Sequence, residues 1–215
     1  MTVKQNLFHY RLDSPYDLII IKENVIPDEH IEELMHLTNN KEKIKQATVI
    51  NSDEDGNRSS LEKLESRNTL WYDIPKKEGY DLQAAIALMF LRFCVPKYHC
   101  EFKSYHACQF LGYPVGGHYI EHNDSENFDK GEWKRVQDRD ISFLFYLNSE
   151  FGGGELEFPE LGLTIKPKKG MMIAFPSYKE YVHKVHPVTW GHRYTLVSWV
   201  GTKEKLYDTI PREGV

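Results

Sequence analysis

The chain has 215 residues, of which 40% are hydrophobic and 27% are charged. This balance is typical of one soluble globular domain with a sizeable core, and it excludes an intrinsically disordered chain. The net charge of −5 disfavours a protein that binds nucleic acid through a basic surface, and no apolar run is long enough to span a bilayer.

The N-terminus and the cysteines bear on cellular location. The first ten residues, MTVKQNLFHY, lack the apolar stretch of a signal peptide, which predicts a cytoplasmic protein. Cys94, Cys100 and Cys108 are odd in number and show no CxxC spacing. We therefore expect three reduced thiols that lie partly in the core.

Residues 1–99 are predicted to form a supporting region of a strand and helices. Apolar periodicity, and a Pro-Asp start for the first helix, predict a strand over 16–21 and helices over 27–38 and 82–93. Residues 50–67 are polar and charged, and we expect a mobile loop there.

Residues 100–202 are predicted to be a β-rich core, followed by a tail over 203–215. Short alternating segments are predicted as strands over 102–111, 141–147, 155–158, 163–165, 171–175, 182–188 and 193–200. Many short antiparallel strands favour a sandwich or a barrel. Residues 152–154 are three glycines followed by a strand rather than a helix, so we expect a hairpin turn and not a phosphate loop.

His122 and Asp124 are a candidate pair of metal ligands. Two residues apart on an extended segment, their side chains point to one face and can take neighbouring positions on one metal. Two histidines and one carboxylate leave three coordination sites open, as in non-haem iron(II) oxygenases. Taken alone, the pair is weak evidence of a metal site, and a surface turn is the preferred interpretation.

His183 is the candidate third ligand, and Arg193 follows it by ten residues. We expect a turn over 189–192 to return Arg193 toward the strand that carries His183. A guanidinium there can pair with the distal carboxylate of a chelating co-substrate such as 2-oxoglutarate. His186 is the rival ligand, but it lies an odd number of residues from His183 and is expected on the other face of the strand.

Three segments carry patterns of a known family: YPVGGHYIEHND, RDISFLFYLNSEFGGGELEFPELGLTIKPKKGMMIAF and HKVHPVTWGHR. The first is similar to a Tyr-x-x-Gly-Gly-x-Tyr-x-x-His-x-Asp segment. The second is similar to an Arg-x-x-Thr…Tyr-Leu…Gly-Gly-Glu-x-x-Phe-Pro stretch, and the third to a distal His, Pro-Val, Gly and basic residue. From about Phe102 to Gly201, the chain thus resembles the prolyl 4-hydroxylase branch of the iron(II)/2-oxoglutarate-dependent dioxygenases.

The resemblance implies a fold that is mainly β with flanking α. Its core would be a double-stranded β-helix, the cupin-like jelly roll, with the N-terminal helices packed on it. The resemblance implies iron(II), 2-oxoglutarate and O₂, with ascorbate as a candidate accessory. It implies iron on His122, Asp124 and His183, and 2-oxoglutarate on Arg193, Tyr113, Ser142 and Trp199.

Two of these positions depart from the collagen-type pattern. Arg193 stands where collagen-type enzymes usually have Lys, and Ser142 stands where the family usually has Thr. Read without the resemblance, Tyr113 and Trp199 are ordinary core aromatics. Strand parity puts Trp199 on the same face as Arg193.

The expected activity is hydroxylation of an unactivated C–H bond, with succinate and CO₂ as co-products. A prolyl residue in a peptide or protein is the first substrate choice. A free amino acid or other small molecule is the alternative, and a non-catalytic metal-binding or sugar-binding jelly roll is the alternative of another class. Residues 125–139 and 50–67 are candidate substrate lids or plain solvated loops. No nucleic acid or membrane partner is expected.

Overall fold

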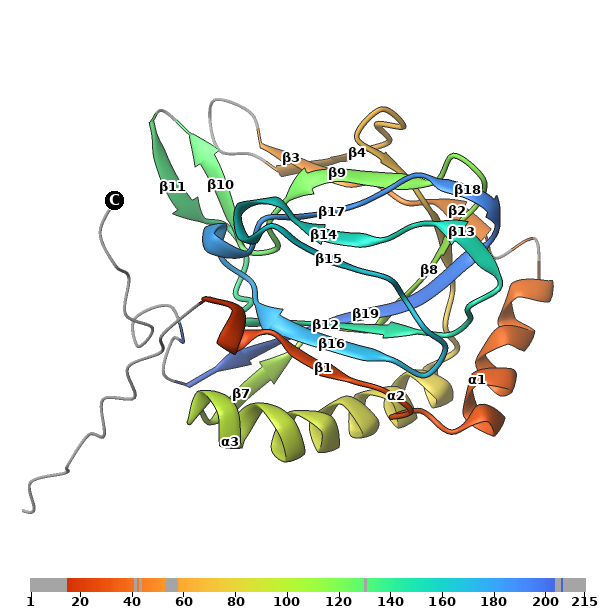
Figure 1. Cartoon of the computed structure of the whole chain (residues 1–215), viewed down its shortest axis with the longest axis horizontal. Coiled ribbons are helices and arrows are strands. Elements are labelled where there is room, and N and C mark those ends of the chain that lie inside the picture. The colour runs from red at the N-terminus through yellow and green to blue at the C-terminus, as the bar shows by residue number, and fades with distance from the viewer. Residues whose placement is uncertain are drawn as a thin grey trace, which may run out of the picture.

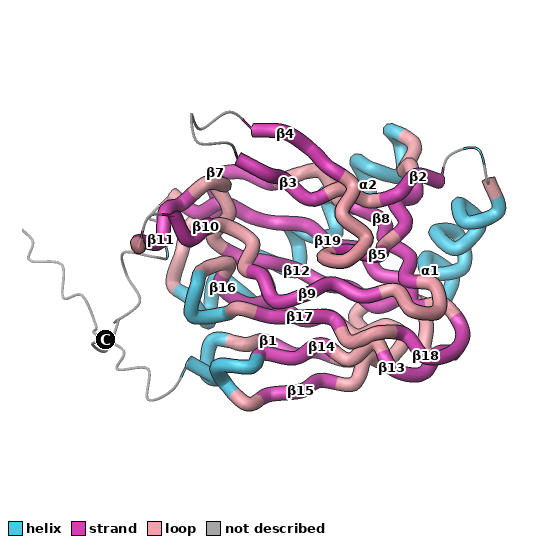
Figure 2. Tube along the Cα trace, turned by 90° about the horizontal axis from the view of Figure 1, so that it is seen from above, coloured by secondary structure: helices cyan, strands magenta, loops and turns pink. Residues whose placement is uncertain are grey.

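Two antiparallel β-sheets lie face to face, and helices cover the outer side of the larger sheet (Figures 1 and 2). In this computed structural model of the chain, the described residues are 15–40, 42, 44–52, 58–129, 131–203 and 206. This is the predicted jelly roll with flanking helices. Among the described residues, no helix is both long and apolar enough to span a membrane.

The larger sheet is built around strands that are buried on both faces. Its order is β1 (Ile20–Lys22), β16 (Met172–Pro176), β12 (Ile141–Tyr146), β19 (Arg193–Thr202), β8 (Gln109–Tyr113), β6 (Leu70–Tyr72) and β2 (Ile44–Gln46), with β7 (Phe102–Tyr105) also paired to β19. Every residue of β12 is buried, because the helices cover one face and the second sheet covers the other. Its β-branched and aromatic sequence, ISFLFY, suits such a strand.

The smaller sheet faces the larger one across the core. Its order is β15 (Leu163–Ile165), β14 (Leu156–Phe158), β17 (His183–Val185), β9 (His118–His122) and β5 (Arg67–Asn68). In β14 and β17, buried and half-buried residues alternate, as expected of strands with one face toward a core.

Three further strand pairs border the sheets. They are β13 (Phe151–Gly153) with β18 (Val188–Gly191), β10 (Glu126–Asp129) with β11 (Glu132–Arg135), and β3 (Val49–Ser52) with β4 (Arg58–Leu61). The pair β10–β11 projects beside the open end of the sandwich in Figure 1.

The helices lie on the outer side of the larger sheet (Figure 1). They are α1 (Asp28–Met35), α2 (Lys76–Met89) and α3 (Val95–Tyr98), and a π-helical turn over 90–94 joins the last two into one rod. Ile86 and Phe90 are buried, and they anchor this rod to the hydrophobic core. The helix predicted over 27–38 is confirmed, with a 3-10 turn over 36–39 at its end.

Four predictions about loops and strands were wrong. In the strand predicted over 16–21, a 3-10 turn, Pro15–Leu18, comes first and β1 begins only at Ile20. The strand predicted over 102–111 is two strands, β7 and β8, which are interrupted after Tyr105 and pair with successive stretches of the same edge of β19. In the loop predicted over 50–67, β3 and β4 pair as a hairpin, while residues 53–57 lie outside the described residues. The glycines at 152–154 form no hairpin turn, because 152 and 153 belong to β13, which pairs with β18.

The turn predicted over 189–192 was also wrong. These residues extend β18 to Gly191, and β18 pairs with β13 rather than folding back. The chain thereby crosses from β17 in the smaller sheet to β19 in the larger one. His183 and Arg193 therefore lie on different sheets, not on two arms of one hairpin.

Candidate active site

The pair His122 and Asp124 is shaped by the end of β9. The strand ends at His122, and the chain then bends at Asp124. The side-chain oxygen of Asn123 accepts hydrogen bonds from the backbone N–H groups of Ser125 (3.2 Å) and Glu126 (2.6 Å). Such an Asx turn is a common way for Asn to fix a bend. The two side chains thus meet because of the turn, not because of the strand parity that the sequence suggested.

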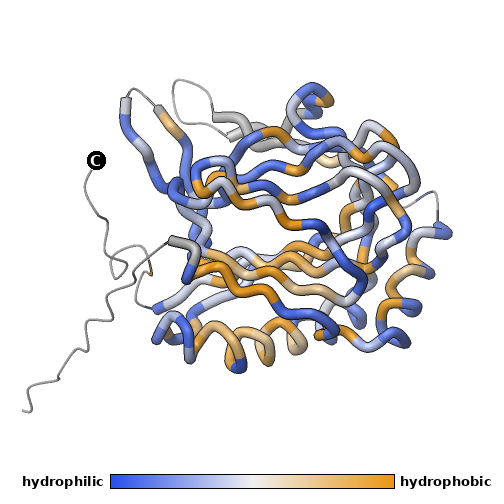
Figure 3. The backbone as a smooth tube through the Cα atoms, viewed as in Figure 1, coloured by the Kyte–Doolittle hydropathy of each residue, from blue (hydrophilic) through white to orange (hydrophobic). Residues whose placement is uncertain are grey.

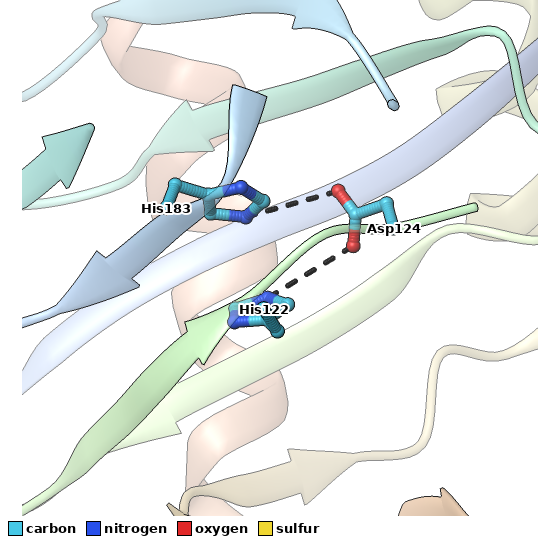
Figure 4. Close-up of side chains that lie close together, drawn as sticks. All are labelled: His122, Asp124 and His183. Atoms are coloured by element: carbon cyan, nitrogen blue, oxygen red, sulfur yellow. Dashed lines mark ion pairs between the residues drawn. The ribbon is translucent and has the colours of Figure 1, made fainter. Parts of the chain in front are cut away.

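His183 reaches the pair from the neighbouring strand. β17 and β9 are antiparallel, and His183 lies directly opposite His122. Its Nε2 lies 3.8 Å from one carboxylate oxygen of Asp124, and the Nε2 of His122 lies 4.0 Å from the other (Figure 4). One atom from each of the three side chains lies within 4.8 Å of the others. The structure therefore brings the predicted ligands together.

Backbone carbonyls fix which nitrogen each histidine presents. The Nδ1 of His122 lies 2.8 Å from the carbonyl oxygen of Ile120, and the Nδ1 of His183 lies 3.0 Å from that of Tyr181. A carbonyl oxygen only accepts, so each Nδ1 carries the proton and each Nε2 keeps its lone pair. Both lone pairs are then available on the side of Asp124, as metal ligation requires.

Burial and charge set the protonation states of the pair. Burial, followed by the neighbouring His183, lowers the pKa of His122 to about 3. Burial opposes ionisation of Asp124, but His183, His122, Arg139 and a hydrogen bond from Ser142 outweigh it and lower the pKa of the carboxyl. At neutral pH, His122 is therefore neutral and Asp124 ionised.

A buried chain of hydroxyls holds the Asp124 carboxylate. The hydroxyl of Ser142 donates to Asp124 Oδ2 at 2.6 Å and lies 2.8 Å from the hydroxyl of Ser177. The hydroxyl of Ser125 donates to the carbonyl oxygen of Ser177 at 2.7 Å. The observed contact of Ser142 is thus with a candidate metal ligand, and a role for Ser142 in binding 2-oxoglutarate stays a prediction.

Arg193 is a fully buried cation without an anion among the described residues. Its guanidinium carbon lies 4.4 Å from the ring centre of Tyr113 and 5.0 Å from that of Tyr146. Nη2 is 3.5 Å from the Tyr146 hydroxyl, while Nε and Nη1 have no hydrogen-bond partner in the described structure. A buried unpaired charge is costly, so this arrangement suits a bound carboxylate. Tyr113 and Arg193 are direct cross-strand neighbours.

A cavity of about 460 Å³ lies beside these side chains, between the two sheets. The candidate ligands, Tyr113 and Trp199 are among the residues that line it. Apolar walls come from Leu144 and Val197, and the remaining lining residues are Thr48, Arg67, Trp71, Gln109, Leu111, Tyr119, Asn123, Glu126, Asn127, Val136, Gln137, Arg139 and Val185. The volume is in the range of small-molecule sites.

The other histidines that the sequence raised as candidates lie away from the site. His186 pairs with Glu157 through its Nε2, and His118 bonds the carbonyl oxygens of Gly116 and Glu65. His192 is exposed, as expected. The choice of His183 over His186 is therefore consistent with the geometry.

Arg139 and Ser177 are site residues that the sequence did not reveal. Arg139 was assigned to the segment 125–139, a candidate lid, yet its guanidinium lies 3.7 Å from the ring centre of Trp199 and donates to the backbone oxygen of Asp124. The position of Arg139 just before the buried strand β12 could have indicated that this side chain belongs to the site. No sequence pattern indicated Ser177, because its contact with Ser142 depends on the pairing of β16 with β12. The middle of this segment is the β10–β11 hairpin.

The residues of this site lie in a segment that resembles a known protein family. A sequence model of the 2OG-Fe(II) oxygenase superfamily matches residues 108–201. Over these residues, which are fewer than half of the chain, the sequence resembles this superfamily. The matched segment runs from β8 to β19 and holds His122, Asp124, His183 and Arg193. The family implies iron(II), 2-oxoglutarate and O₂. Two neutral imidazoles, one carboxylate and an unpaired buried guanidinium fit these groups.

Prolyl hydroxylases are among the proteins similar to this chain. Prolyl 3-hydroxylase 2 of Mus musculus is 42% identical over 79 residues, which are 34% of this chain and 11% of that protein. The putative prolyl 4-hydroxylase of Acanthamoeba polyphaga mimivirus is 24% identical over 211 residues, 93% of this chain and 80% of that protein. The match to prolyl 3-hydroxylase 2 thus spans about a tenth of that relative.

Solved structures share the fold of this chain. The viral collagen prolyl hydroxylase of Paramecium Bursaria Chlorella virus-1, in its 2OG complex, aligns with a TM-score of 0.62 and 23% identity over 85% of this chain and 94% of that chain. A prolyl hydroxylase of Trichoplax adhaerens, in complex with a hypoxia inducible factor peptide fragment, aligns with a TM-score of 0.59 and 20% identity over 91% and 88%.

Proposed function

We propose that this oxygenase hydroxylates a prolyl residue in a peptide or protein and forms succinate and CO₂ as co-products. The observation that supports this most directly is the meeting of His122, Asp124 and His183 within 4.8 Å, beside a cavity and the buried Arg193. Metal ligands alone would suit a binding module. An unpaired guanidinium near them favours a co-substrate carboxylate and hence turnover.

Bound iron(II), together with 2-oxoglutarate and O₂, supplies oxidation of an unactivated C–H bond. The chain supplies the geometry. His122 and His183 offer neutral Nε2 atoms whose directions are fixed by the backbone carbonyls of Ile120 and Tyr181. The hydrogen bond from Ser142 restricts rotation of the Asp124 carboxylate.

Arg193 is the proposed partner of the distal carboxylate of 2-oxoglutarate. Its unpartnered Nε and Nη1 leave N–H donors for a carboxylate, and the rings of Tyr113 and Tyr146 keep its plane in place. Burial between two sheets excludes water and strengthens this charge pair. Leu144 and Val197 on the cavity wall extend the dry surface toward the substrate space. Our proposal includes ascorbate as an accessory reductant, and omitting it from the assay tests that part.

The names of relatives support a prolyl residue as the target. Prolyl 3-hydroxylase 2 and a putative prolyl 4-hydroxylase differ in the ring carbon that their names specify, so the proposal leaves the carbon open. The cavity extends from the ligands to Trp71, Gln109 and Asn127, which is more room than 2-oxoglutarate needs. A side chain presented by a peptide fits this arrangement.

The test is a succinate-release screen with proline-rich peptides, free proline and other free amino acids, followed by mass spectrometry of the product. We expect succinate and the gain of one oxygen atom with a peptide, loss of both in His183→Ala, and retention of both in His186→Ala. Release with a free amino acid but with no peptide would move the substrate to the small-molecule class. Absence of succinate with every substrate would overturn the enzyme assignment.

A further inference from the structure

An exposed apolar stripe runs along α2 on the side away from the larger sheet. Tyr80, Leu88 and Leu91 are 68%, 63% and 58% exposed, and Ala84 between them is exposed as well. Their spacing of three or four residues puts all four on one face of the rod formed by α2 and the π turn. In Figure 3 this rod carries hydrophobic segments along the lower edge of the molecule. Large side chains gathered on one face differ from singly scattered exposed residues, and such patches mark interfaces.

A groove beside the stripe widens this apolar surface. It lies between α1 and α2, has a volume of about 370 Å³, and shares Leu88 with the stripe. Its floor includes Leu34, Leu82 and Met89. Together, the stripe and the groove form a surface wider than one helix, which a stable protein contact requires.

Charges at the two ends of the stripe have opposite sign. Asp81 lies on one flank near the N-terminal end, and Arg92 lies on the same flank near the C-terminal end. Both are exposed, and neither has an ion-pair partner among the described residues. The N-terminal end also carries exposed Lys77, so the complementarity depends on Asp81 and Arg92, whose opposite charges meet when a second copy packs in the opposite direction.

We propose that two copies of this chain associate through α2, antiparallel, about a two-fold axis near Ile86. In this arrangement Tyr80 packs against Leu91 of the second copy, and Asp81 pairs with Arg92 of the second copy. A two-fold axis perpendicular to α2 reverses the direction of the helix but leaves each flank on the same side of the contact. Asp81 of one copy therefore meets Arg92 of the other. Ala84 and its exposed neighbour Ala85 lie near the crossing, where small side chains allow two helices to approach closely.

The proposed contact is separate from the catalytic cavity. α2 covers the outer side of the larger sheet, while the cavity lies between the sheets (Figure 1). Each copy therefore keeps a complete site, and the dimer leaves basal turnover unchanged.

Sedimentation of the full chain over a broad concentration series tests the proposal. We expect a concentration-dependent dimer of the 25.3 kDa chain and a monomer for Leu88→Glu. Leu64→Glu is the matched control, because Leu64 is 55% exposed on a turn outside the surface, and we expect it to remain dimeric. Circular dichroism of each variant checks that the fold is intact.

Charge exchange tests the antiparallel register. Asp81→Arg and Arg92→Glu each place like charges together and are expected to weaken the dimer by about tenfold. The double variant D81R/R92E restores opposite charges and is expected to restore dimerisation. A wild-type chain that stays monomeric, a dimer that survives Leu88→Glu, or a double variant as weak as the single ones would each overturn the proposal.

Discussion

At the scale of single residues, the chemistry of the site depends on which ring nitrogen each histidine presents. The carbonyl oxygens of Ile120 and Tyr181 hold the protons of His122 and His183 on Nδ1. Both Nε2 lone pairs then converge on the side of Asp124. This second layer of contacts makes the three side chains a ligand set rather than a chance cluster.

Replacement of His183 separates ligation from packing. In His183→Ala we expect affinity for a divalent ion such as Co(II) to fall by more than about 100-fold, because one of three ligands is lost. His186→Ala is the control, since His186 pairs with Glu157 outside the site. Calorimetric titration of both variants gives the affinities. The ligand assignment is wrong if His186→Ala, and not His183→Ala, abolishes binding.

Replacement of Arg193 tests the proposed co-substrate contact. In Arg193→Met the buried volume is nearly kept and the charge is lost, so we expect the KM for 2-oxoglutarate to rise by about 10- to 100-fold. Metal affinity should stay unchanged, because Arg193 is no candidate ligand. Arg193→Lys should lie between the two, since it keeps the charge without the bidentate fork. An unchanged KM in Arg193→Met would remove Arg193 from the co-substrate site.

At the scale of secondary-structure elements, the crossing from β17 to β19 determines where Arg193 lies. The crossing strand β18 pairs with β13, and the register shifts between Gly152 and Gly153. Gly153 has a φ of +69°, and a Cβ there would meet the carbonyl oxygen of Pro187. Both the backbone conformation and the close approach therefore require glycine at this position.

A pair of glycine replacements tests this account of the crossing. In Gly153→Ala we expect the free energy of unfolding to fall by about 2–4 kcal/mol, because strain and a backbone clash add. Gly79→Ala is the matched control, since Gly79 lies inside α2 and an added Cβ would meet no atom within 4 Å. There we expect a gain of about 0.5–1 kcal/mol. Urea denaturation measures both, and equal effects would contradict the proposed role of Gly153.

Sequence periodicity predicted individual helices and strands better than it predicted which strands pair. The first helix and the strands β12, β16 and β19 follow from local patterns, and parity placed Trp199 and Val197 on the cavity side. The crossing at β18 did not follow, because it depends on pairing with β13, which lies far earlier in the chain. The hairpin β3–β4 was missed because its polar sequence lacks the apolar alternation that marks a strand. Turn-like residues such as Gly191 look the same in a hairpin and in a crossing.

At the scale of the whole molecule, the site is assembled from two sheets. His122 and His183 belong to the smaller sheet, while Arg193, Ser142 and Tyr113 belong to the larger one. The sequence motifs identified site residues in both sheets, but they did not predict the cavity between the sheets. The contact of Ser177 with Ser142 depends on the pairing of β16 with β12, so no local pattern could have revealed it.

The most direct test of the iron and 2-oxoglutarate assignment is an anaerobic titration of the full chain with iron(II) and 2-oxoglutarate, followed by visible absorption. Chelation of iron by 2-oxoglutarate gives a weak charge-transfer band, which we expect in the wild-type chain and in His186→Ala. We expect no band in His183→Ala. A wild-type chain that binds iron(II) but develops no band on addition of 2-oxoglutarate would contradict the proposed enzyme.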